Sequence, residues 1–188
     1  MNKKINVGII GATGMVGQNF ACLLADHPWF NVNYVAASPK SAGKTYVEAV
    51  AGRWLMPEKI PDSVSGLTVH DAGDVSQAAQ HCNVVFSAVS MEKSAIKKLE
   101  SEYARSGFVV VSNNSAHRSS EDVPVLIPEI NPEHIEIIPE QQRSHGFEKG
   151  FIVVKPNCSI QSYMIPVHAL LQAGYKVKTL FVTTMQSM

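Results

Sequence analysis

The sequence has few cysteines, no excess of charge and no long hydrophobic run, and each absence argues against a class of protein. Cys22, Cys82 and Cys158 are an odd number without paired or metal-type spacing, which argues against a disulfide framework and a metal site. Sixteen basic residues balance sixteen acidic ones, so no net charge attracts nucleic acid or an anionic membrane. We therefore expect no metal, nucleic acid or membrane among its ligands and partners.

No stretch reaches the roughly 20 apolar residues that a membrane-spanning helix needs. Residues 1–4 lead directly into a strand pattern, whereas a signal peptide would continue into an apolar core. The lack of a disulfide pattern fits a reducing compartment, so we expect a cytoplasmic protein. With 188 residues, 45% of them hydrophobic, the chain can bury the core of one large domain, or of one domain and part of another.

A strand, a glycine-rich turn and a helix follow one another at the start of the chain. Ile5–Ile10 is mainly apolar, as in a parallel strand buried on both faces. Residues 11–17 read Gly-Ala-Thr-Gly-Met-Val-Gly, and apolar residues at helical spacing continue to Leu24. Such a turn lets the backbone approach a pyrophosphate at the helix N-terminus. We predict a dinucleotide site, with a ligand-free turn as the alternative; its residues are Gly11, Thr13, Gly14, Met15, Val16 and Gly17.

The loop after the second predicted strand, residues 32–37, indicates which dinucleotide binds. NAD is usually held by an acidic residue about 20 residues past the glycines, because a carboxylate accepts a hydrogen bond from the ribose hydroxyl. No acid follows this strand. The loop instead carries Ser38, Lys40 and Ser41, whose hydroxyls and ammonium suit a phosphate group. We predict NADP as the cofactor, and an ordinary solvated loop is the alternative.

Further strands and helices alternate along the chain. Residues 83–89 and 108–111 are predicted strands, and a helix opened by Ser90 lies between them. The alternation predicts an α/β fold with a doubly wound parallel sheet, in which ligands bind beyond the carboxyl ends of the strands. Ser90 follows such an end and is a further predicted cofactor-binding residue. Residues 45–70 are predicted to form an irregular covering loop, with a strand near residues 67–69 as an alternative for its end.

Residues 112–118, Ser-Asn-Asn-Ser-Ala-His-Arg, leave the carboxyl end of the strand at 108–111. The planar guanidinium of Arg118 suits a phosphate or carboxylate, and Asn113 adds an amide. Residues 122–131 then place apolar side chains between prolines and bring Glu129 to a fixed place. A solvated polar loop is the alternative, but the position at the sheet edge favours an anion site.

Residues 152–161, Ile-Val-Val-Lys-Pro-Asn-Cys-Ser-Ile-Gln, pass from a strand pattern into a helical one. Cys158 therefore lies at a helix N-terminus, where unpaired N–H groups and the helix dipole favour thiolate over thiol. A thiolate there is a candidate nucleophile, and a buried inert cysteine is the alternative.

Together these stretches resemble aspartate-semialdehyde dehydrogenase, particularly its archaeal and fungal branch. The resemblance rests on the glycine turn, the Ala-Ser-Pro-Lys-Ser-Ala-Gly-Lys loop, Ser-Asn-Asn-Ser-Ala-His-Arg, Val-Pro-Val-Leu-Ile-Pro-Glu-Ile-Asn and Pro-Asn-Cys-Ser, in order along the chain. It implies a Rossmann NADP-binding domain at residues 1–156. It also implies that residues 157–188 begin an α+β catalytic and dimerisation domain related to that of glyceraldehyde-3-phosphate dehydrogenase.

The reaction that this resemblance implies is the NADP-dependent interconversion of β-aspartyl phosphate and aspartate semialdehyde, in lysine, threonine and methionine biosynthesis. Cys158 matches the nucleophile that forms the thioester, and Asn157, the asparagine before it, is expected to contact the substrate. Arg118, with Asn113 or Asn114 beside it, matches the arginine that binds the acyl phosphate. Gln186 resembles a glutamine that orients the substrate. The full-length family members are expected to be homo-oligomers that act on a small molecule.

The family also needs a histidine acid/base and a second arginine, both beyond the position where this chain ends at Met188. We therefore expect an N-terminal part of such an enzyme, inactive by itself, with residues 177–184 as one strand of an unfinished second sheet. Two alternatives stay open. One is a catalytically silent NADP-binding module. The other is a related acyl-phosphate or acyl-CoA reductase, such as N-acetyl-glutamyl-phosphate reductase or malonyl-CoA reductase.

Overall fold

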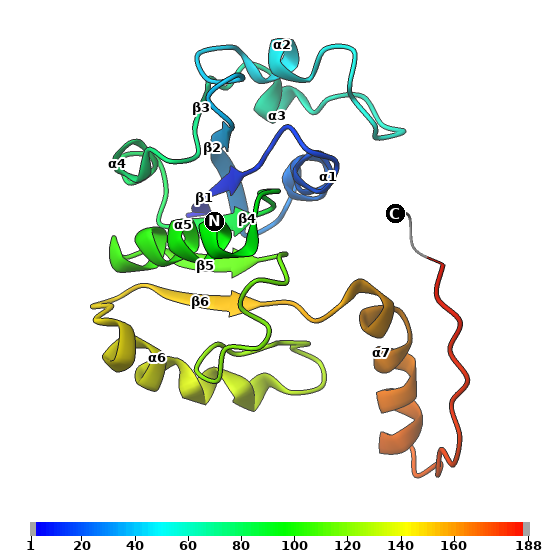
Figure 1. The fold of residues 1–188 in the computed structure, drawn as a ribbon. Helices are drawn as coiled ribbons and strands as arrows, with labels where there is room; N and C mark the ends of the chain where they lie inside the picture. Colours follow the sequence, from blue (N-terminus) through cyan, green and yellow to red (C-terminus); the bar gives the residue numbers. More distant parts are fainter. Residues whose placement is uncertain (1–2, 186–188) are drawn as a thin grey trace.

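Six parallel strands form one sheet at the centre of the structure. The computed structural model describes residues 3–185. The strands lie in the order β3-β2-β1-β4-β5-β6, and every neighbouring pair is parallel (Figure 1). This arrangement confirms the predicted doubly wound sheet. The strands are β1 (Ile5–Ile10), β2 (Phe30–Ala37), β3 (Val69–Asp71), β4 (Val84–Ser87), β5 (Val109–Ser112) and β6 (Phe151–Val154).

Helices fill the connections between the strands and follow the last of them. Strand β1 has the predicted bounds, and β2, β4 and β5 differ from the predicted strands by at most two residues at either end. Within the described residues, every helix is too short or too polar to cross a lipid bilayer. The helices are α1 (Met15–Leu24), α2 (Tyr46–Val50), α3 (Asp62–Ser65), α4 (Val75–Ala78), α5 (Lys93–Arg105), the 3-10 helix η1 (Pro132–Ile137), α6 (Ile138–His145) and α7 (Cys158–Gln172).

The predicted irregular loop at residues 45–70 is wrong in part, because it contains the helices α2 and α3 and leads into β3. Thr45 and Glu48 form a capping box: each side chain satisfies a backbone N–H at the start of α2. Tyr46 is fully buried, and its hydroxyl donates to the carbonyl of Ala12 at 2.9 Å. A local cap and one long-range contact therefore order a segment whose prolines predicted a loop.

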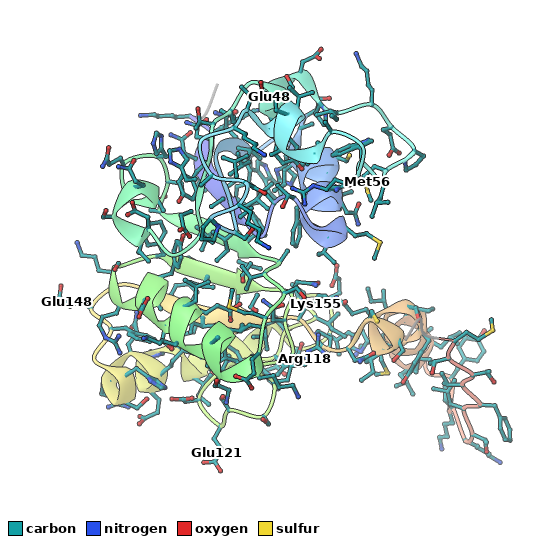
Figure 2. The ribbon with its side chains drawn as sticks, turned by 45° about the horizontal axis from the view of Figure 1, so that its top comes forward. Glu48, Met56, Arg118, Glu121, Glu148 and Lys155 are labelled. Carbon is teal, nitrogen blue, oxygen red and sulfur yellow. The ribbon has the colours of Figure 1, made fainter. Side chains whose placement is uncertain are left out.

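The prediction of a strand at residues 177–184 is also wrong. These residues follow α7 as an extended segment without strand pairing, away from the sheet (Figures 1 and 2). An extended segment becomes a strand only when a neighbour shares its hydrogen-bond ladder, and no described residue supplies one. Helix α7 has no buried residue, and the side chains of Leu171 and Phe181 are 49% and 94% exposed. This helix therefore has an apolar face that the other described residues do not bury.

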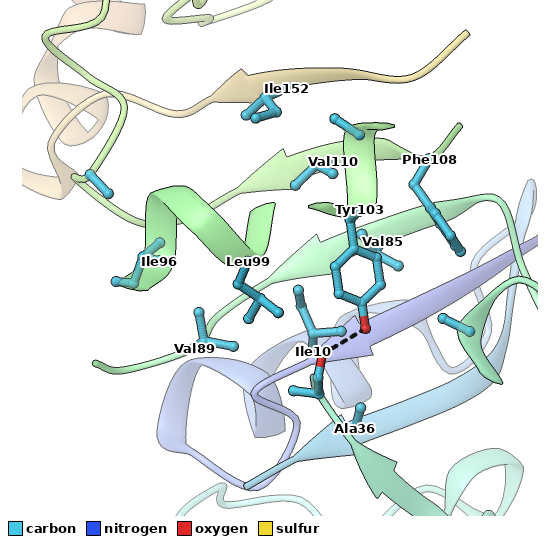
Figure 3. Packing of buried hydrophobic residues seen from close by; sticks show 14 of the residues in the cluster. Ile10, Ala36, Val85, Val89, Ile96, Leu99, Tyr103, Phe108, Val110 and Ile152 are labelled. Carbon is cyan, nitrogen blue, oxygen red and sulfur yellow. Dashed lines mark hydrogen bonds between the residues drawn. The ribbon is translucent and has the colours of Figure 1, made fainter. Parts of the chain in front are cut away.

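Each face of the sheet carries its own apolar core, so the molecule has three layers. On one face, α5 packs Ile96, Leu99 and Tyr103 against strand residues such as Val85 and Val110 (Figure 3). The core on the other face joins side chains of β1 and β2 to those of α1, α2 and α3. Because both faces are covered, the open edge at the carboxyl ends of the strands is the place for a ligand.

Gly17 is required where α1 packs on the glycine turn. A Cβ at this position would lie 2.2 Å from the carbonyl oxygen of Gly11 and 2.6 Å from the Cα of Ala12. Both atoms belong to the backbone, so neither can move aside like a flexible side chain.

We predict that Gly17→Ala lowers the free energy of unfolding by about 2 kcal/mol, because the helix must shift away from the turn. Denaturant unfolding would measure the change. Gly66→Ala is the matched control, since a Cβ at Gly66 meets no atom within 4 Å and its φ is −89°. Equal effects of the two substitutions would contradict close packing at Gly17.

Candidate functional site

The polar loops meet at one edge because backbone hydrogen bonds continue the sheet into them. In each case the first N–H beyond a strand donates to the last or second-last residue of a neighbouring strand, over 2.8 to 3.1 Å. The starts of the loops are therefore fixed relative to one another by the register of the sheet. The bonds join Gly11 N to Ala36 O, Ala72 N to Ala37 O, Ala88 N to Ile10 O, Asn113 N to Ser87 O and Lys155 N to Ser112 O.

A cavity of about 420 Å³ opens at this edge, which is within the usual range for a ligand pocket. Five residues predicted to bind the cofactor line it: Gly11, Thr13, Gly14, Ser38 and Ser90. Sequence reasoning did not predict the rest of the wall, which is made of Ala37, Pro39, Asp71, Ala72, Gly73, Ala88, Val89, Met91 and Leu99. The cavity thus gathers residues from the ends of β1, β2, β3 and β4.

The N-terminus of α1 suits a pyrophosphate. Gly14 is its N-cap, no side chain caps the helix, and no acidic residue lies in its first turn. Backbone N–H groups at such a start are donors for an anion. The side chains of Met15 and Val16 do not line the cavity, and Gly17 is buried under the turn. These three residues can therefore contribute through their backbone N–H groups.

The loop that follows β2 differs from its prediction because Ser41 is buried and because Arg53 binds to it. Ser38 lines the cavity and Lys40 is exposed next to it, but Ser41 is only 4% exposed. The hydroxyl of Ser41 accepts a hydrogen bond from Nη2 of Arg53 at 3.0 Å. Arg53 also donates to the carbonyl of Ala49. Sequence reasoning missed Arg53, which fixes the base of this loop.

An acidic residue does border the cavity, but it lies on β3 and not directly after β2. Asp71 ends β3 and pairs in register with Ala37 at the end of β2. Its Oδ1 accepts from the N–H of Gly73 at 2.9 Å. The absence of an acid directly after β2 therefore does not by itself exclude NAD, and the evidence for NADP rests on Ser38 and Lys40.

Arg118 connects the loop after β5 to the end of β6. Its Nε donates to the carbonyl of Lys155 at 3.0 Å, and its Nη2 donates to the carbonyl of Asn113 at 3.3 Å. Figure 2 shows the labelled Arg118 and Lys155 beside each other near the start of α7. A guanidinium has five N–H donors, so Arg118 retains donors for an anion.

Lys155 is a second cation at this place, and sequence reasoning missed it. Its side chain is half-buried, and its Nζ donates to the carbonyl of Pro156 at 3.3 Å. Burial lowers the pKa of the Lys155 ammonium, the positive charge of Arg118 lowers it further, and Cys158 raises it. The signal was visible in the sequence as a basic residue three positions before the cysteine.

Cys158 is the first residue of α7 and is exposed, as a nucleophile must be. Asn157 caps this helix: its Oδ1 accepts from the N–H and the hydroxyl of Ser159, at 2.9 and 2.6 Å. The same oxygen lies 3.7 Å from the sulfur of Cys158, which donates to it. Asn157, predicted to contact the substrate, is therefore engaged in holding the cysteine at the helix start.

The remaining predicted residues are placed differently. Glu129 is exposed in the turn at 127–131 and lines none of the cavities described here. Gln186 lies outside the described residues. The residues before it do return to the cysteine: 182–185 and Cys158 line one hollow of about 280 Å³.

Comparison with known proteins identifies the class. The family model for the NAD-binding domain of semialdehyde dehydrogenases matches residues 6–138, and the chain belongs to this family.

The relatives that it resembles in particular are aspartate-semialdehyde dehydrogenases. The one from Archaeoglobus fulgidus is 38% identical over 187 residues, which are 98% of this chain and 51% of the relative. The one from Saccharomyces cerevisiae is 35% identical over 98% of this chain and 50% of the relative. The chain thus spans about half the length of the curated relatives it matches.

Solved structures of aspartate-semialdehyde dehydrogenases have a similar fold. The aspartate-semialdehyde dehydrogenase of Candida albicans with NADP superimposes with a TM-score of 0.76 at 32% identity, over 91% of this chain and 48% of that one. Enzyme II of Vibrio cholerae, complexed with ASA, gives a TM-score of 0.64 at 27% identity, again over 91% and 48%.

We predict that Lys155→Met slows alkylation of Cys158 at neutral pH by about threefold, because the positive charge of the Lys155 ammonium stabilises negative charge on the reacting sulfur. Mass spectrometry of the alkylated peptides would measure the rate. Lys149→Met, at the opposite end of β6, is the matched control and should leave the rate unchanged.

Cys82 serves as an internal reference in the same samples. It is buried, and burial raises the pKa of its thiol to about 12, so it should react slowly in every variant. If Lys155→Met and Lys149→Met alkylate at the same rate, Lys155 does not act on the cysteine.

Proposed function

We propose that this chain is the NADP-binding and nucleophile-bearing part of an aspartate-semialdehyde dehydrogenase. Residues 1–156 would form the cofactor domain and residue 157 would begin the catalytic domain. The observation that carries the proposal is the hydrogen bond from the Arg118 side chain to the backbone carbonyl of Lys155. It brings a guanidinium and an ammonium to the start of the helix that bears Cys158. Two cations beside a thiol suit the attack of a thiolate on an acyl phosphate.

The first step follows from these residues. The thiolate of Cys158 attacks the acyl carbon of β-aspartyl phosphate, and the bond from that carbon to the phosphate oxygen breaks. Arg118 and Lys155 neutralise the charge of the departing phosphate, and the amide of Asn113 donates a hydrogen bond to it. The product is a thioester on Cys158 and free inorganic phosphate.

NADPH, when bound, would supply the hydride that reduces this thioester, so that the carbon–sulfur bond breaks, aspartate semialdehyde leaves and the sulfur returns as thiolate. This chain's own residues would hold the cofactor: the start of α1 would receive the pyrophosphate, while Ser38 and Lys40 would receive the 2′-phosphate. Gln186 would orient the substrate, and Glu129 would take part in substrate binding. The histidine acid/base and second arginine that the reaction needs would lie in the half of the enzyme that this chain does not span. Lysine, threonine and methionine biosynthesis would use the product, and the whole enzyme would be a homo-oligomer.

A second function is NADP binding without chemistry. It is favoured by the composition of the cofactor cavity, whose lining residues all fall between Gly11 and Leu99. Cofactor binding therefore does not depend on Cys158, and the two functions can be tested separately.

The proposed function predicts an acyl adduct on one cysteine. The chain would be mixed with β-aspartyl phosphate made freshly by an aspartate kinase and ATP, and mass spectrometry would locate the aspartyl thioester. We expect it on the peptide that contains Cys158, and we expect Cys158→Ser to lack it while binding NADP like the unsubstituted chain. NADP binding without any adduct would favour the silent module. An adduct on Cys22 or Cys82 alone would refute the nucleophile assignment.

The phosphate loop predicts a change of cofactor preference. Lys40→Glu should weaken NADP binding by about tenfold and NAD binding much less, because the new carboxylate repels the 2′-phosphate. Fluorescence or calorimetric titration of both cofactors would measure this. Lys149→Glu makes the same charge change at the opposite edge of the sheet and should alter neither affinity. Equal weakening of NADP and NAD by Lys40→Glu would rule out the phosphate loop.

A further inference from the structure

Glu100 is a carboxylate in the middle of an otherwise apolar helix face. Its neighbours on α5, Ile96, Leu99 and Tyr103, pack against the sheet (Figure 3), whereas Glu100 is itself 0% exposed. Among residues 3–185 it is the only acidic side chain buried to this degree. Burying a carboxylate is costly unless hydrogen bonds compensate for the lost water. Such a group is retained where its hydrogen bonds do something that apolar packing cannot.

One oxygen of Glu100 receives three hydrogen bonds from three separate places. Oε1 accepts from the hydroxyl of Ser87 at 2.6 Å, the hydroxyl of Ser112 at 2.8 Å and Nδ2 of Asn114 at 2.9 Å. Ser87 ends β4, directly before the cavity wall at 88–91, and Ser112 ends β5. Asn114 belongs to the loop that leads to Arg118. A single atom therefore ties the wall of the cofactor cavity to the anion-binding loop.

The other oxygen faces the far end of the same loop. Oε2 lies 3.5 Å from Nε2 of His117, and both atoms are buried without a hydrogen-bond partner. Burial lowers the pKa of His117 to about 4, so the imidazole is neutral at neutral pH, while burial raises the pKa of Glu100. Glu100 thus holds the loop by a hydrogen bond at Asn114 and lies against it again at His117, the residue before Arg118.

We propose that Glu100 is a positioning residue that sets the loop 112–118, and through it Arg118, against the wall of the cofactor cavity. The hydrogen bonds of Arg118 to the carbonyls of Asn113 and Lys155 depend on where this loop lies. What the loop binds, a phosphate group, rests on the proposed function; that Glu100 positions the loop does not.

The positioning role is tested on the 188-residue chain without any ligand. Solvent exchange of the Arg118 Nε–H, followed by NMR, reports its hydrogen bond to Lys155. Exchange of the Val110 N–H, in the middle of β5, serves as the reference for opening of the whole domain. Glu100→Met removes the acceptor of the Ser87 and Ser112 hydroxyls and leaves Nδ2 of Asn114 only its bond to Oγ of Ser87. We therefore expect Arg118 exchange to rise by about tenfold relative to Val110. Glu100→Gln keeps a weaker, neutral acceptor and should raise it by about threefold.

Tyr103→Phe is the matched control. It lies on the same helix, is also fully buried, and loses one buried hydrogen bond, from its hydroxyl to the carbonyl of Ala72. We expect it to destabilise the fold and leave the Arg118 exchange ratio unchanged. If the control raises the ratio as much as Glu100→Met does, Glu100 is merely structural and the proposal is overturned. Should Glu100→Met fail to fold, Glu100→Gln decides alone, and an unchanged ratio overturns the proposal.

Titration with inorganic phosphate and with NADP then separates this role from the proposed function. Glu100→Gln should weaken phosphate binding by about threefold and leave NADP affinity within about twofold. If the unsubstituted chain binds no phosphate, the assignment of Arg118 to an acyl phosphate fails. The exchange ratio still decides the role of Glu100 in that case, because it is measured without ligand.

Discussion

The backbone hydrogen bonds that carry the sheet into its loops are the constraint on which the site depends. Gly11, Asn113 and Lys155 each donate to a neighbouring strand immediately after their own strand ends. Since all six strands run in one direction, these loops must begin at the same edge. Arg118 and Lys155 are 37 residues apart in the chain, and this register brings their loops to the same edge. Side-chain hydrogen bonds, such as those of Glu100, then hold the loop after β5 in position.

Much of the fold could be predicted because its signals are local. Strand β1 is a buried apolar run with glycines after it, and its bounds were predicted without error. The failures came where a distant contact decides the structure. Tyr46 is helical because its ring is buried and its hydroxyl reaches Ala12, and residues 177–184 stay unpaired because no described neighbour offers a ladder. The spacing of apolar residues along the sequence indicates neither of these facts.

The candidate site shows the same division. Arg118 and Cys158 could be predicted because their chemical type and their place at strand ends are visible in the sequence. Asp71 and Glu100 could not, since each acts through a group that is remote in the chain or hidden by burial, whereas Lys155 was visible in the sequence three positions before the cysteine. Asp71 reaches the cavity only because β3 lies beside β2, and the donors to Glu100 lie 12 to 14 residues away on two strands and a loop. A pattern search reads Glu100 as an ordinary helix surface residue.

The most direct test of the central claim is a map of where NADP binds, from the backbone amide shifts of the chain titrated with the cofactor. The claim predicts changes that cluster at residues 11–14, 38–40, 71–73 and 88–91, around the 420 Å³ cavity. A second cavity of about 340 Å³ lies between the loop after Arg118 and η1, lined by Val123 and His134 among others. Shifts confined to that second cavity, with the glycine turn unchanged, would contradict the assignment of the sheet edge as the cofactor site.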